Sequence, residues 1–291
     1  MTPIASDRPF LPDTLTPLSH TAAYGGLTDE QRLRYNQLHG LYVNEQILLF
    51  EESLAGPVLG GLLQMPLPHG LDGSLRHFRD DEARHSTMFR ELNRELAPGL
   101  YGQGDFRFIE APRTARRVLG ALGRHPRWFP MLLWLMLMLE ERALHYGRDV
   151  LRHADALEPR AVETQRRHLR DEAHHVGWDQ DVLDWLWPRT ERPLRHLNAA
   201  LFTWLVGEFF SVPRRGALAV VRELAAVCPE LEPRRPALVR ELRALAGRAA
   251  FHTSLYSRHI VPQTFRRFDR WPEFARVGRA LRAYRPVEAA R

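Results

Sequence analysis

The sequence contains no lysine, a single cysteine and no apolar run long enough to cross a membrane. Cys228 on its own can form neither an intrachain disulfide nor a cysteine-based metal site. The most apolar run, residues 131–139, is far shorter than the roughly 20 residues of a transmembrane helix. The N-terminus also lacks the basic start and apolar stretch of a signal peptide. We therefore expect a cytoplasmic protein without a membrane partner.

Because lysine is absent, arginine supplies all of the 41 basic residues, which stand against 35 acidic ones and give a formal net charge of +6. A basic balance of this kind would suit nucleic acid. The arginines, however, alternate with Glu, Asp and Leu along helical faces instead of clustering with aromatic residues. We therefore expect a solvated, arginine-rich surface and no nucleic-acid partner. A hydrophobic content of 44% over 291 residues is sufficient for a sizeable core.

The apolar residues follow helical spacing throughout, and no segment shows strand alternation, so the predicted class is all-α. Thr28, with Gln31 three residues later, predicts the start of the first long helix. Long helices are expected at about 28–63, 74–96, 130–154 and 159–186, in the order of a four-helix bundle. Shorter helical stretches are expected at about 113–122, 195–211, 214–227, 236–257 and 272–284. We predict an extended arm over 1–26 and one helical domain over 27–291, with the bundle in 27–188 and additional packing helices in 193–291.

The four long helices contain a weak internal repeat. The segment LFEESL (49–54) precedes DEARH (81–85), and MLEERA (138–143) precedes DEAHH (171–175). Glu52 lies 30 residues before Glu82, and Glu141 lies 31 residues before Glu172. Each half is therefore a helix that carries a Glu, a return, and a helix that carries Glu-x-x-His.

Helical geometry predicts that these side chains share one interior. Positions i and i+3 lie on one face, so Glu82 projects with His85, and Glu172 with His175. His168 falls within about 60° of the latter pair, at roughly 100° per residue. In the first helix, Glu52 lies on a mainly apolar stripe formed by Leu41, Glu45, Leu48, Ala55 and Leu59. Glu45 shares this face and is the alternative to Glu52, whereas the stripe disfavours Glu51 and, in the third helix, Glu140.

Several carboxylates in one core repel each other unless a cation holds them. A Glu from each of two helices and Glu-x-x-His from the other two form the ligand set of ferritin-like di-iron and di-manganese proteins. Mixed oxygen and nitrogen donors suit two iron ions, with manganese as the alternative, better than a closed zinc site. The spacing by itself predicts a ferritin-like di-metal oxidase or oxygenase. The alternatives are salt-bridged surface helices, an iron-oxidising or storage protein, and a desaturase or carbon hydroxylase.

The segment LTDEQRLRYNQLHGLYVNEQ, the two DE-x-x-H segments and above all HLRDEAHH resemble the di-iron N-oxygenases of the p-aminobenzoate N-oxygenase type, over about residues 27–188. The resemblance implies a seventh metal ligand at His168, and it implies the other six at the positions Glu52, Glu82, His85, Glu141, Glu172 and His175. It further implies oxygenation of a small-molecule amine by O2, through hydroxylamine toward nitroso and nitro products, in secondary metabolism. By resemblance to di-iron proteins generally, Asp81 and Asp171 would each hydrogen-bond a ligand histidine.

Other residues near these motifs are given no role in the chemistry. His145, four residues after Glu141, is expected to be a core histidine, and Arg84 and His174 are expected to point away from the metal face. No flavin or ferredoxin motif accompanies the site. The sequence therefore predicts an external electron donor or reductase, and it is compatible with a homodimer.

Overall fold

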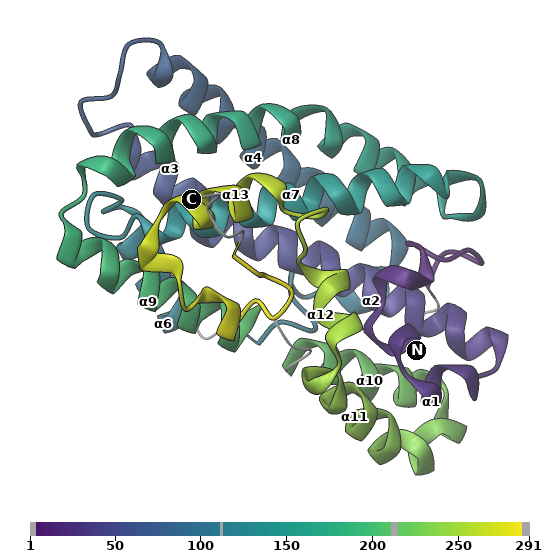
Figure 1. The fold of residues 1–291 in the computed structure, drawn as a ribbon. Coiled ribbons are helices and arrows are strands. Elements are labelled where there is room, and N and C mark those ends of the chain that lie inside the picture. The colour runs from purple at the N-terminus through teal and green to yellow at the C-terminus, as the bar shows by residue number, and fades with distance from the viewer. Residues whose placement is uncertain (1–3, 111–112, 211–214, 287–291) are drawn as a thin grey trace.

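The computed structural model describes residues 4–110, 113–210 and 215–286. These residues form helices and connecting segments, and no strand occurs among them (Figure 1). The predicted all-α class is therefore confirmed. Long helices lie side by side across the upper part of the view, and shorter C-terminal helices pack beneath and in front of them.

The first long helical segment changes its winding in the middle. Helix α2 (Asp29–Phe50) begins at the predicted capping box, in which the Thr28 hydroxyl accepts a hydrogen bond from the Gln31 amide and the Gln31 side chain accepts one from the Thr28 amide. The π-helical turn η3 (Glu51–Ala55) follows, and α3 (Gly56–Leu62) completes the segment. A π turn holds more residues per turn than an α-helix, so it rotates the side chains that follow away from an extrapolated α-helical stripe.

Three more long helices complete the bundle: α4 (Leu71–Leu96), α7 (Met131–Arg152) and α8 (Pro159–Leu186). α8 begins with a proline at its first position, where the missing amide hydrogen costs nothing. α2 packs on α4, α4 on α8, and α7 on α8, while η3 contacts both α4 and α7. Buried apolar side chains fill the interior of the bundle, among them Leu59, Phe78, Trp134 and Leu183.

The helices that follow α8 cover the outside of the bundle. α9 (Arg192–Phe209) and α13 (Pro262–Arg270) pack on α7, and α10 (Arg215–Val227) packs on α2. Shorter elements complete the chain: α5 (Pro98–Tyr101), α6 (Arg113–Gly123), η4 (Ala154–Ala156), η5 (Trp187–Arg189), η6 (Pro229–Arg234), α11 (Arg235–Ala244), η7 (Leu245–Gly247), α12 (Ala249–Leu255), η8 (Pro272–Phe274) and η9 (Val277–Arg279). The division of the chain at 27–188 and 193–291 stays a prediction.

Two predicted C-terminal helices differ from the structure. The stretch 236–257 is divided by η7 into α11 and α12, and the stretch 272–284 contains only the short turns η8 and η9. The regular helix here is α13, which begins at Pro262 and ends before Trp271-Pro272. Proline at the first position starts a helix but cannot continue the preceding one, so each proline resets the helical register.

The segment before α2 is not simply extended. It forms the short turns η1 (Asp13–Leu15) and η2 (Pro17–His20) and the helix α1 (Ala22–Gly25). Phe10, Leu11 and Leu18 are buried, and the Asn36 side chain accepts a hydrogen bond of 2.8 Å from the Phe10 amide. Apolar residues between the prolines therefore attach this segment to the core. Residues 1–3 of the predicted arm lie outside the described part of the chain.

Within residues 4–110, 113–210 and 215–286, none of the helices combines the length and the apolar character that crossing a membrane requires.

Candidate metal centre

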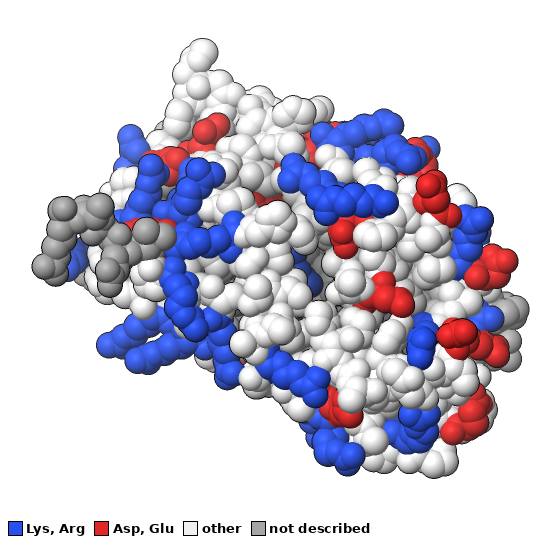
Figure 2. Space-filling model, turned by 45° about the vertical axis from the view of Figure 1, so that its right-hand side comes forward, with Lys and Arg blue, Asp and Glu red and all other residues white. Residues whose placement is uncertain are grey.

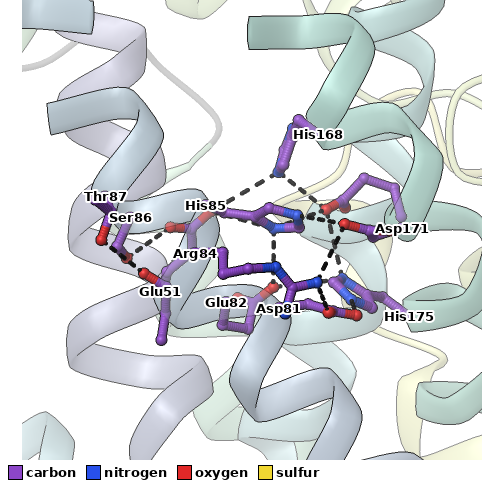
Figure 3. Close-up of polar contacts among 12 residues, drawn as sticks. Glu51, Asp81, Glu82, Arg84, His85, Ser86, Thr87, His168, Asp171 and His175 are labelled. Carbon is purple, nitrogen blue, oxygen red and sulfur yellow. Dashed lines mark hydrogen bonds and ion pairs between the residues drawn. The ribbon is translucent and has the colours of Figure 1, made fainter. Parts of the chain in front are cut away.

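Seven acidic and histidine side chains converge in the middle of the bundle, and none is more than 4% exposed. We call them the Glu/His cluster: Glu51 from η3, Glu82 and His85 from α4, Glu140 from α7, and His168, Glu172 and His175 from α8. Figure 3 shows how the side chains from η3, α4 and α8 point toward one another. The structure thus brings together five of the seven residues that the sequence suggested, with Glu51 and Glu140 as additional members.

Glu172 lies at the centre of the three histidines. Its Oε1 atom is 2.9 Å from Nε2 of His168, 3.4 Å from Nδ1 of His175 and 3.7 Å from Nδ1 of His85. One donor atom each from Glu82, His85, Glu172 and His175 lies within 4.8 Å of the others, a spacing at which the four could hold one metal ion. A second group of the same compactness consists of Glu51, His85 and His168. Two overlapping groups therefore provide donors for two adjacent ions.

Many polar atoms of the cluster are buried without a hydrogen-bond partner. They are Oε1 of Glu51, Oε2 of Glu82, Nδ1 of His85, Oε1 of Glu140, both carboxylate oxygens of Glu172 and Nδ1 of His175. A buried polar atom left unpaired costs about 1–3 kcal/mol, and more when it is charged. Metal ions would give these atoms partners, and carboxylate oxygens with imidazole nitrogens are a donor set that iron and manganese accept. The residues therefore fit a pair of such ions.

Two aspartates support the histidines from outside the cluster. Oδ2 of Asp171 on α8 is 3.0 Å from Nε2 of His85 on α4, and Oδ2 of Asp81 on α4 is 3.2 Å from Nε2 of His175 on α8. When the carboxylate accepts the Nε2 hydrogen, the Nδ1 lone pair is left facing the cluster. The expectation that each aspartate hydrogen-bonds a histidine is confirmed in geometry.

Arg84 lies outside the cluster, with its side chain 56% exposed, and connects the two aspartates. Its guanidinium forms an ion pair with Asp81 and approaches Oδ2 of Asp171 at 3.9 Å (Figure 3). The exposed guanidinium offsets part of the negative charge behind the histidines. The sequence contained a signal for this contact, because Arg84 stands three residues after Asp81 on the same helix.

Glu52 does not face the cluster as predicted. Its side chain is 37% exposed and pairs with Arg90, whereas the preceding residue, Glu51, is buried and accepts a hydrogen bond of 2.7 Å from the Ser86 hydroxyl. The stripe that favoured Glu52 assumed α-helical winding from Leu41 to Leu59. The π turn η3 starts at Glu51 and breaks that winding.

Glu141 is buried but serves a different contact. Its carboxylate accepts hydrogen bonds from the Gln263 amide at 2.7 Å and from the Thr264 amide and hydroxyl at 2.8 and 2.7 Å. It therefore holds the N-terminus of α13, where unpaired amides favour an anion. The neighbouring Glu140 points into the bundle instead, because a step of one residue turns the side chain by about 100°.

Glu45, the alternative to Glu52, also lies outside the cluster. It is completely buried and accepts hydrogen bonds from the Tyr101 hydroxyl at 2.8 Å and from the amides of Arg107, Phe108 and Ile109 at 2.7 to 2.9 Å. Burial raises its pKa, and these donors act against the rise. Glu45 thus fastens the loop that follows α5.

The cluster carboxylates are electrostatically unequal. Burial raises the pKa of Glu51 and of Glu140 well above the usual value, and neighbouring carboxylates, Glu82 for the first and Glu172 for the second, add to the rise. Burial also acts to raise the pKa of Glu172, but His168, Glu140 and His175 outweigh it and hold that pKa well below the usual value. Burial lowers the pKa of His175, but the nearby carboxylates of Glu172, Glu82 and Asp81 together outweigh it and raise the pKa to about 9. Without a cation, protons held on these groups therefore offset part of the negative charge of the cluster.

Asp179, one turn beyond His175, was missed by the sequence reasoning. It is 1% exposed, and its Oδ2 atom has no hydrogen-bond partner. Burial raises the pKa of its carboxyl well above the usual value. The spacing of four residues from His175 could have identified it, because such residues share a helical face.

The sequence was compared with known families and proteins. The family model described as p-aminobenzoate N-oxygenase AurF matches residues 2–255, a range that contains every residue of the Glu/His cluster. The search of curated proteins finds no match. Since the family match covers well over half of the 291 residues and confirms the resemblance noted in the sequence, this chain belongs to the p-aminobenzoate N-oxygenase AurF family.

Proposed function

We propose that the protein is an O2-dependent di-iron oxygenase that oxidises the amine nitrogen of a small molecule, with the Glu/His cluster as its metal site. The family match supports an oxygenase, and the buried cluster is compatible with a di-metal site. The proposed ligands are Glu51, Glu82, His85, Glu140, His168, Glu172 and His175. Iron is the proposed metal, with manganese as the alternative.

His168 is the observation that carries the proposal. Four glutamates and two histidines already complete the general ligand set of ferritin-like di-iron proteins. His168 adds a third imidazole, with Nε2 at 2.9 Å from Glu172 and 3.7 Å from Glu51, and its ring packs edge-on against Phe89 and His85. The buried ring therefore directs a neutral donor toward both groups of ligands. This extra donor supports an N-oxygenase over a ferritin-like di-iron protein with the general ligand set.

The protein residues have three tasks in this proposal. Two iron ions, when bound, supply the activation of O2 and the redox chemistry. Asp81 and Asp171 keep the Nδ1 lone pairs of His175 and His85 directed inward. Phe78, stacked on His175 at 4.0 Å between ring centroids, and Phe89, edge-on to His168 at 5.1 Å, place apolar rings against two of the cluster histidines.

The first oxygenation must balance atoms and electrons. An amine, O2, two electrons and two protons give a hydroxylamine and water. The two electrons must come from outside the substrate, so the proposal includes an external donor.

The test is a reaction of the iron-loaded protein with a panel of aryl and aliphatic amines, a chemical reductant and ¹⁸O2. A product that carries ¹⁸O on nitrogen, one atom for a hydroxylamine or nitroso product and two for a nitro product, is the expected result by mass spectrometry. Loss of two hydrogens or oxygen on carbon would support a desaturase or hydroxylase instead. Ferric mineral without an oxidised amine would support iron storage.

A further inference from the structure

The positive charge of the chain is concentrated near its C-terminus. Residues 262–286 contain seven arginines and two acidic residues, a net charge of +5 (7 − 2), whereas the whole chain carries +6. The remaining residues are therefore almost balanced. The alternation of arginine with acidic residues expected from the sequence does not hold in this segment.

Both carboxylates of the segment are already paired. Asp269 accepts hydrogen bonds from Arg258 at 2.8 and 3.0 Å, and Glu273 accepts one from Arg195 at 2.8 Å. The buried Arg267 pairs with Asp184 of α8. Six exposed arginines remain, and within the described ranges none of them forms an ion pair with a carboxylate. We call them the arginine surface: Arg266, Arg270, Arg276, Arg279, Arg282 and Arg285.

The face drawn in Figure 2 shows the same imbalance. Blue side chains gather at the left with few red ones among them, whereas blue and red alternate at the right. The C-terminal segment lies at the front of Figure 1. In Figure 2 the right-hand side of Figure 1 has come forward, so the front of Figure 1 has moved toward the left. No large apolar side chain of residues 262–286 is among the exposed ones of the described chain. Exposed apolar side chains occur instead on the adjacent helix α9, which packs on η8 and η9: Leu197, Trp204 and Phe209.

The part of the arginine surface on α13, Arg266 and Arg270, lies over helices that carry the cluster, whereas η8 and η9 pack on α9. α13 packs on α7, and its first amides are bound by Glu141, the residue after Glu140. Phe268 and Phe274 pack on Trp134 of α7 at 5.5 and 4.5 Å between ring centroids. Arg267 joins α13 to α8 through Asp184. Buried contacts therefore hold this charged layer rigidly against the helices of the metal site.

We propose that the arginine surface docks an acidic, ferredoxin-like one-electron carrier protein, which delivers the two electrons of each turnover in successive encounters. This inference rests on the proposed function, since only an O2-dependent reaction needs that donor. A cluster of uncompensated charge steers an oppositely charged protein and raises its association rate by one to three orders of magnitude. Nucleic acid is a weaker candidate, because residues 262–286 themselves expose no large aromatic ring on which single strands could stack. An anionic membrane, whose interface takes up exposed apolar groups such as Leu197, Trp204 and Phe209 on the adjacent α9, is the alternative outcome of the test.

The test measures anaerobic reduction of the oxidised, iron-loaded protein by a reduced plant-type [2Fe–2S] ferredoxin in a stopped-flow instrument. The double variant Arg266→Glu/Arg270→Glu is compared with Arg240→Glu/Arg243→Glu on α11, which changes the net charge equally at two exposed arginines away from α7 and α8. We expect the second-order rate constant of the first variant to fall at least tenfold at low salt, and that of the control less than twofold. The wild-type rate constant should also fall as salt screens the charges.

A small chemical reductant separates this proposal from the proposed function. Dithionite with methyl viologen should reduce the wild-type protein and both variants at equal rates and support equal amine oxidation. Failure of all three proteins in that arm counts against the oxygenase itself. Equal rates with ferredoxin in the two variants, or a salt-independent wild-type rate, overturns the docking proposal. The docking proposal is also overturned if Arg266→Glu/Arg270→Glu keeps its rate with ferredoxin and loses only its binding to phosphatidylserine vesicles or to single-stranded DNA.

Discussion

Asp171 and His85 lie on different helices and meet at 3.0 Å, and Asp81 and His175 repeat this contact in the opposite direction at 3.2 Å. The Asp that precedes each Glu-x-x-His glutamate thus serves the histidine of the other motif. Each half of the repeat therefore supplies the aspartate that orients the histidine of the other half.

Replacing Asp171 with Asn should weaken metal binding about 10- to 100-fold, because the amide no longer fixes the His85 tautomer as a carboxylate does. The measurement is iron affinity in competition with a chelator. Asp80→Asn is the control, since Asp80 is exposed on the same helix as His85 and pairs with Arg79 on the surface. Equal affinity in the two variants would show that Asp171 does not support the metal.

Replacing Glu51 with Ala should remove at least one of the two iron ions, whereas Glu52→Ala should retain both. The reason is that Glu51 is buried beside His85 and His168, while Glu52 pairs with Arg90 on the surface. Metal analysis of the two purified variants checks this prediction. Loss of iron from Glu52→Ala alone would restore the original sequence-based interpretation.

Replacing Glu141 with Ala should leave the metal content unchanged and lower the free energy of unfolding by about 2–4 kcal/mol. Three donors at the start of α13, two of them buried, would lose their acceptor. Chemical denaturation of the metal-free protein measures the loss. A fall in iron content without a loss of stability would contradict the role assigned to Glu141.

The sequence predicts much of this site because Glu-x-x-His is a local signal. A separation of three residues determines the shared face of Glu82 and His85 whatever the rest of the chain does. The choice between adjacent glutamates has no such signal. Glu51 and Glu140 lie 31 and 32 residues before their partners, and Glu52 and Glu141 lie 30 and 31, so the repeat cannot separate them. The π turn that begins at Glu51 selects Glu51 over Glu52, and the amides of α13 draw Glu141 out of the cluster in favour of Glu140. Both features depend on tertiary packing.

His39 should make the protein sensitive to acid. Burial, aided by Arg142, lowers the pKa of its imidazole from 6.5 to about 3, and the ring packs between Tyr35 and Tyr42. The folded state therefore binds fewer protons than the unfolded state between these values. Its stability contribution is complete above pH 6.5 and falls by about 1.4 kcal/mol per pH unit as the pH drops toward 3.

The variant His39→Phe should consequently gain about 3 kcal/mol relative to wild type between pH 7.5 and pH 4.5. Denaturation curves at a series of pH values measure this difference. The exposed His69→Phe is the control and should run parallel to wild type. Parallel curves for His39→Phe would mean that His39 titrates normally in the folded protein.

The last prediction concerns His168, which separates amine oxygenation from general di-iron chemistry. His168→Ala should keep the fold and at least one iron ion, because Glu82, His85, Glu172 and His175 still form a compact group. It should lose at least nine-tenths of amine oxygenation, since a neutral donor near both Glu51 and Glu172 is removed. His174→Ala on the same helix is the matched control, because its exposed ring stacks on Trp178. Iron content, circular dichroism and product yield are measured together. An alanine variant with full iron and full turnover would make His168 a core histidine, and the N-oxygenase proposal would then lose the residue that distinguishes it from a desaturase or a carbon hydroxylase.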